Sequence, residues 1–324
     1  MKNRFLKYAA FAISSLLAPL CISCNGNDNG KMKIITTIFP EYDWVMNVLG
    51  DKKDNFDVSM LLDSGVDLHS YEPTIKDTIA ISNCDLFVYV GGESDEWVDD
   101  VLDQAKNNDM VVINLMDVLG DKAKEEEIIE GMEGEEEGEE GEEEGPEYDE
   151  HVWLSLNNSQ LFVQTISDSL SKLDKDNANY YKNNADTYIN NLKDLDAQYK
   201  DAVSKASKDT LVFADRFPFR YLVDDYSLKY YAAFIGCSAE TEASFETIAF
   251  LANKVDELGL NYILKIESSD GAIANTVKNT TKNKNQTILT MDSVQSATSK
   301  EYASGRNYLS IMQNNLGVLK QALS

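Results

Sequence analysis

The residues best suited to chemistry in this chain are two histidines and an aspartate. His69 lies in the segment GVDLHSYEP, just past an apolar run expected to form a strand at 56–62, and His151 lies in YDEHVWLS. Asp292 ends a further expected strand, ILTMD. The carboxyl ends of strands are where open α/β sheets bind ligands. Two neutral imidazoles and a carboxylate suit Zn²⁺, or Mn²⁺ with more oxygen ligands. The residues alone therefore favour a metal site, and a surface role for each histidine stays open.

A glutamate-rich segment immediately precedes His151. Residues 125–150 contain fifteen Glu and one Asp, with no Lys or Arg and with five interspersed glycines. Like charges repel each other and glycine disfavours helix, so we expect a disordered acidic loop at 122–148. Such a loop would bind cations weakly, or it would serve only as a solvated spacer.

The overall charge excludes one class of partner. The formal net charge is −27, and nucleic-acid binding depends on Lys and Arg. We therefore expect no nucleic-acid partner, and a surface that attracts cations.

The N-terminus has the pattern of an export signal. Basic residues precede an apolar stretch that is too short to span a bilayer comfortably. Cys24 follows a serine, as in a bacterial lipoprotein signal, whereas Cys21 follows a leucine and fits less well. We expect a signal peptide at 1–23, a lipidated Cys24, a tether at 24–31 and an extracytoplasmic, membrane-anchored protein. The alternative is an ordinary signal peptide with incidental cysteines.

The rest of the chain reads as two α/β lobes. Apolar strand-like runs alternate with amphipathic helical segments, which predicts parallel sheets at 32–172 and 208–324. Between them, apolar residues recur at three- and four-residue steps and predict a long bridging helix at 173–207. We expect this helix to brace the two lobes.

Several motifs together resemble a known family. GVDLHSYEPT, DLFVYVGGESDEWV, DEHVWLSLNNSQ and SIMQNNLGVLKQAL occur in the order and spacing of the zinc and manganese solute-binding proteins of ABC transporters. The resemblance runs nearly end to end across the mature chain. It implies two α/β lobes bridged by a long helix, with the metal in the cleft between them.

The resemblance also implies a ligand set, with one departure. His69, His151 and Asp292 match three family ligands. The family's remaining ligand, usually His or Glu, falls at Ala214, which cannot bind metal. Residues that could replace it are Asp215, Glu267, Cys237 and Glu240. A thiolate would favour zinc, and more carboxylate would favour manganese.

The expected function is that of a zinc receptor, a monomer that delivers its ion to an ABC permease. A manganese or iron receptor of the same family is the first alternative. A surface adhesion protein with a degenerate metal site is the second. The third is a metal-dependent hydrolase, against which stands the lack of an HExxH helix or a nucleophile elbow. We therefore expect no enzymatic activity.

Overall fold

The computed structural model describes residues 30–134, 147–238 and 242–324. Residues Met32–Ser324 form one compact unit, and the expected signal peptide and Cys24 lie outside the described residues. Within the described ranges, no helix is both long and apolar enough to cross a bilayer.

The N-terminal lobe is built on a four-stranded parallel sheet with strand order β2-β1-β3-β4. Its strands are β1 (Met32–Thr36), β2 (Phe56–Met60), β3 (Leu86–Tyr89) and β4 (Val111–Asn114). Its helices are α1 (Phe39–Leu49), α2 (Ile75–Ser82), α3 (Trp97–Leu102) and α4 (Leu115–Leu119), with short 3₁₀ turns η1 (Gly50–Asn55), η2 (Leu68–Ser70), η3 (Glu93–Asp95) and η4 (Gly120–Lys122). All four residues of β3 are buried, as expected for a central parallel strand.

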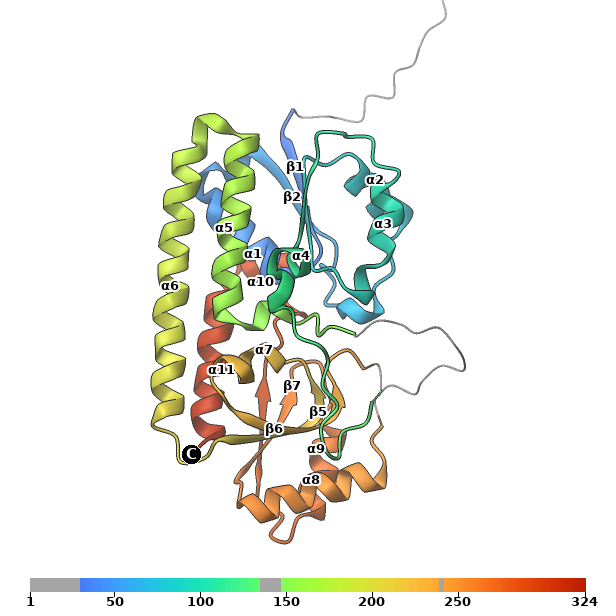
Figure 1. Cartoon of the computed structure of the whole chain (residues 1–324), viewed down its shortest axis with the longest axis vertical. Helices are drawn as coiled ribbons and strands as arrows, with labels where there is room; N and C mark the ends of the chain where they lie inside the picture. Colours follow the sequence, from blue (N-terminus) through green and yellow to red (C-terminus); the bar gives the residue numbers. More distant parts are fainter. Residues whose placement is uncertain (1–29, 135–146, 239–241) are drawn as a thin grey trace, which may run out of the picture. The chain divides into compact units, whose positions relative to one another are not determined.

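The C-terminal lobe repeats this design, with strand order β6-β5-β7-β8 (Figure 1). Its strands are β5 (Thr210–Phe217), β6 (Lys229–Ile235), β7 (Tyr262–Ile266) and β8 (Thr287–Met291). Its helices are α7 (Arg220–Asp225), α8 (Phe245–Leu258), α9 (Ala272–Thr280) and α11 (Tyr308–Ala322), whereas α10 (Ser299–Ala303) follows β8 in the sequence but packs against α1. The two parallel sheets confirm the predicted α/β class.

A long helix joins the lobes. After η5 (Val152–Leu154), α5 (Leu156–Leu173) and η6 (Lys175–Asn177) lead into α6 (Ala178–Ser204), which at 27 residues is about 40 Å long. It packs against α5 and α1, and against α11, where the Tyr199 hydroxyl donates to the Met312 carbonyl at 2.6 Å. The predicted bridging helix is therefore present.

The acidic segment differs in part from the expected disordered loop. The backbone of Glu125 pairs with that of Tyr148, and the backbone of Glu133 pairs with β6. Met132 is buried in the core, so the few apolar residues among the glutamates attach this part of the segment to the C-terminal lobe. Residues 135–146 lie outside the described residues.

Candidate metal site

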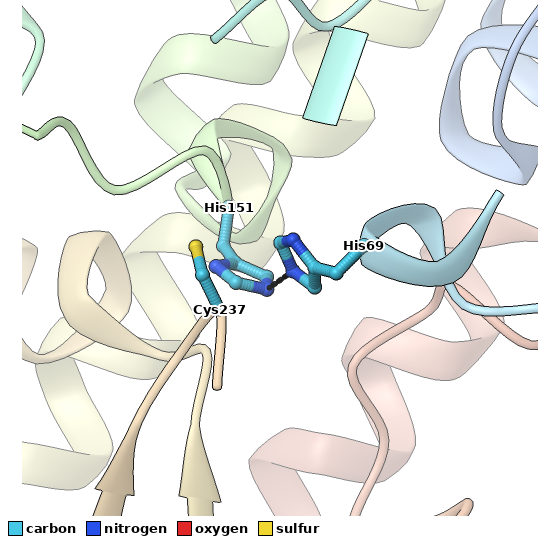
Figure 2. A group of neighbouring side chains, drawn as sticks. All are labelled: His69, His151 and Cys237. Atoms are coloured by element: carbon cyan, nitrogen blue, oxygen red, sulfur yellow. Dashed lines mark hydrogen bonds between the residues drawn. The ribbon is translucent and has the colours of Figure 1, made fainter. Parts of the chain in front are cut away.

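His69, His151 and Cys237 come together from distant parts of the sequence. One ligand atom from each residue lies within 4.8 Å of the other two. The Nε2 atoms of the two histidines are 3.2 Å apart, and Figure 2 shows the two rings approaching each other through these nitrogens. The structure thus places both predicted histidines beside Cys237, one of the residues proposed to replace the ligand missing at Ala214.

Short local structures position the three side chains. His69 lies in η2, where the Asp67 carboxylate accepts from its backbone N–H at 3.2 Å. His151 directly precedes η5, and Cys237 follows β6 after Gly236. A Cβ atom at Gly236 would lie 3.0 Å from the His151 ring, so the glycine allows the C-terminal lobe to approach this closely.

Both imidazoles are oriented through their Nδ1 atoms. Nδ1 of His69 is 2.7 Å from the Ser94 hydroxyl, and Nδ1 of His151 is 3.1 Å from the Asp149 carboxylate. Such partners fix the ring orientation of metal-binding histidines. With a proton on each Nδ1, the two Nε2 lone pairs face each other, an arrangement that a cation between them would stabilise.

Burial dominates the electrostatics of the group. Burial and the neighbouring His151 lower the pKa of His69 to about 3, which keeps this imidazole neutral. Burial opposes a charge on His151, but the carboxylates of Asp149, Glu150 and Asp67 together outweigh it and raise the pKa of that ring. Burial, with the carboxylates of Asp149 and Glu126, raises the pKa of the Cys237 thiol well above its usual range.

The donor set fits zinc. Zn–N and Zn–S bonds of about 2.0–2.1 and 2.3 Å in a tetrahedron separate ligand atoms by roughly 3.3–3.8 Å. The 3.2 Å between the imidazole nitrogens is close to this spacing, and the three ligand atoms all lie within 4.8 Å of one another. Sulfur and imidazole ligands favour zinc over manganese, which prefers oxygen.

The structure does not bring the carboxylate candidates into this group. Asp292 accepts from the Arg306 guanidinium at 2.6 Å and from the Val294 backbone at 2.8 Å. Glu267 accepts from the backbone and hydroxyl of Ser293 at 2.7 and 2.8 Å. Both carboxylates already have protein partners, so their roles as ligands stay predictions.

The end of β5 supplies no ligand to the group either. Ala214 is buried in the apolar cluster around Val212. Asp215 accepts from the Ile266 backbone at 3.2 Å. Arg216 extends toward the group instead, and pairs with Asp67 at 2.5 Å. Glu240 lies outside the described residues.

Sequence reasoning missed the residues around the three candidate ligands. Ser94 and Asp149 contact the imidazoles, and Glu126 acts electrostatically on Cys237. Asp149 has a local signal, because it lies two residues before His151. The other two are distant in sequence from their partners and carry no such signal.

Comparison with known proteins gives a consistent result. The family model described as ZnuA, zinc-uptake complex component A, periplasmic, matches residues 34–322. The zinc-binding lipoprotein AdcA of Streptococcus pneumoniae strain R6 is 34% identical over 316 residues, which cover 95% of this chain and 60% of the relative. The high-affinity zinc uptake system protein ZnuA of Bacillus subtilis is 33% identical, covering 90% of this chain and 88% of the relative.

Solved structures agree with the fold. The Zn(II)-bound ZnuA-like domain of Streptococcus pneumoniae AdcA superimposes with a TM-score of 0.70 at 30% identity, covering 91% of this chain and 99% of that one. The metal-dependent lipoprotein YcdH of Bacillus subtilis gives 0.73 at 29% identity, covering 90% and 99%. The chain spans only 56–60% of the length of the streptococcal AdcA relatives that it matches.

Proposed function

This chain belongs to the ZnuA family of zinc-uptake components, and from that membership we propose that it is an extracytoplasmic zinc receptor of an ABC importer. The family predicted from the sequence motifs is thereby confirmed. Proteins of this family bind a solute rather than transform it, which agrees with the expectation of no enzymatic activity.

The observation that carries the proposal is the convergence of His69, His151 and Cys237. We assign these residues as zinc ligands, with water or a carboxylate completing the shell. Two imidazoles and a thiolate select zinc over manganese, because manganese binds soft sulfur ligands poorly.

The origin of the ligands supports a mechanism of capture and release. His69 belongs to the N-terminal lobe and Cys237 to the C-terminal lobe. A shared zinc ion would therefore tie the lobes together, beside the existing ion pair between Asp67 and Arg216. Zinc binding would stabilise one arrangement of the two lobes, and the permease could recognise that arrangement.

Two further features complete the proposal. Lipidation at Cys24 would hold the receptor at the outer face of the cell membrane, near its permease. We propose that the protein acts as a monomer, since the three candidate ligands need no residue from a second chain.

Zinc is expected to stabilise the metal-free chain against heat. An ion that binds only the folded state adds about 2.7 kcal/mol at a free concentration of 100 times its Kd. For a chain of this size, Tm should rise by about 4 °C. Thermal unfolding followed by circular dichroism, with buffered free Zn²⁺ or Mn²⁺, measures the shift.

The His69→Ala variant is the control for that shift. It should show little stabilisation by zinc, while its metal-free Tm stays close to that of the parent. A larger shift with Mn²⁺ than with Zn²⁺ would assign the protein to the manganese alternative. No shift with either ion would contradict a receptor function.

A further inference from the structure

A small acidic cavity borders the candidate zinc ligands. Its volume is about 210 Å³, and it is lined by His69 and Cys237 together with four glutamates, Glu93, Glu126, Glu147 and Glu150. None of the residues lining it is Lys or Arg. The cavity has room for an ion and several waters, because one water occupies about 30 Å³.

Glu150, which lines this cavity, has a buried carboxylate oxygen without a hydrogen-bond partner. Its side chain is 2% exposed, and Oε1 accepts from the Ser94 backbone N–H at 2.8 Å. Oε2 has no hydrogen-bond partner in the structure and lies 3.5 Å from Nδ1 of His69. An unsatisfied buried carboxylate is costly, so the structure has a place for a positive charge here.

Glu126 supplies a second such oxygen from the acidic segment. Its Oε1 is buried without a hydrogen-bond partner. The carboxylates of Glu126 and Glu150 both act electrostatically on the Cys237 thiol. Both residues with an unsatisfied oxygen therefore line one cavity, which Cys237 also lines.

The backbone is shaped to admit the Glu150 carboxylate. Gly92 has a φ of +86°, and a Cβ atom at this position would lie 2.3 Å from Oε1 of Glu150. Only glycine allows this conformation and this close approach together. The fold thus accommodates the Glu150 carboxylate inside the protein, beside the candidate ligands, and not at the surface.

We propose that Glu126 and Glu150 form an outer divalent-cation site, from which zinc passes to His69, His151 and Cys237. The inference rests on the proposed zinc-receptor function. Oxygen donors completed by water hold zinc less tightly than nitrogen and sulfur, so the outer site exchanges its ion quickly. The high negative charge density of the cavity raises the local concentration of cations and speeds capture.

The double variant Glu126→Gln/Glu150→Gln tests the outer site. Metal-free chain is mixed with Zn²⁺ in a stopped-flow instrument, and competition with a chelator gives the equilibrium Kd of the same samples. We expect the association rate constant to fall about tenfold or more, since focused charge raises on-rates by roughly 10–10³. The tight-site Kd should change much less than this rate, because a site on the binding path speeds zinc entry and exit alike, and the zinc stoichiometry of that site should stay at one.

Glu125→Gln/Glu130→Gln is the matched control, because it removes the same charge from neighbouring residues that do not line the cavity. Equal association rates in the two double variants would overturn the outer site, while tight binding by the parent would leave the receptor function intact. Loss of the tight site in a folded Glu126→Gln/Glu150→Gln variant would also overturn it, by making these glutamates primary ligands. If the double variant does not fold, the single variant Glu126→Gln is compared with Glu125→Gln.

Discussion

Replacing His151 with alanine is expected to lower zinc affinity by about 100-fold or more. The Nε2 of this buried ring lies 3.2 Å from that of His69. His151 is therefore assigned as one of the three residues whose ligand atoms converge. Replacing a residue that only hydrogen-bonds to a metal ligand already lowers metal affinity by about 10–100-fold. Replacing the ligand itself should lower it at least as much. Equilibrium competition with a chromophoric zinc chelator measures the change.

The variant Asp149→Asn provides a graded comparison. It keeps His151 but weakens the interaction that orients its ring at 3.1 Å, so a smaller loss, of about tenfold, is expected. Circular dichroism and the metal-free Tm show whether both variants fold. Zinc affinity within threefold of the parent in a folded His151→Ala variant would remove this histidine from the site.

Replacing Cys237 with alanine is expected to change the type of metal that the protein prefers. The thiolate is the only soft donor that the structure brings to the histidines within the described ranges. Without it, zinc affinity should fall by about 10-fold or more, while Mn²⁺ binding, which gains little from sulfur, should change much less. Co²⁺ titration reports the thiolate directly, through an intense near-ultraviolet thiolate-to-metal band.

Cys84 is the matched control for that experiment. It is buried among apolar residues around Phe87 in the N-terminal lobe. Cys84→Ala should keep the Co²⁺ band, and Cys237→Ala should lose it. An unchanged band in Cys237→Ala would show that the sulfur does not coordinate, and that water or a carboxylate occupies its place.

The sequence predicts the fold well because its signals are local. Runs such as LFVY at β3 are continuously apolar, and α6 buries residues at steps of three and four, so strands and the long helix can be identified without tertiary information. The acidic segment was harder to predict. Its charge density outweighs the few apolar residues, such as Met132, that attach it to the C-terminal lobe.

The site was predicted only in part, for a physical reason. His69 and His151 are recognisable because histidine is rare in this chain, and because His69 follows a predicted strand while His151 ends the acidic segment. Whether a carboxylate is available for metal depends on partners elsewhere in the fold. Asp292 is paired with Arg306, whereas Glu150 retains an unpartnered oxygen, and neither fact is readable from spacing.

Cys237 shows the same limit. It is one of four cysteines, and its sequence context does not distinguish a buried thiol from a ligand. Only the three-dimensional arrangement, in which Gly236 allows the turn after β6 to approach the His151 ring, brings the sulfur to the two imidazoles.

Calorimetric titration of the metal-free chain with Zn²⁺, and separately with Mn²⁺, at one pH and salt concentration, tests the central claim most directly. The account predicts one tight equivalent of zinc, weaker additional equivalents at the carboxylates, and distinctly weaker manganese binding. Only weak, multiple binding of both ions would contradict it, because His69, His151 and Cys237 would then form no metal site.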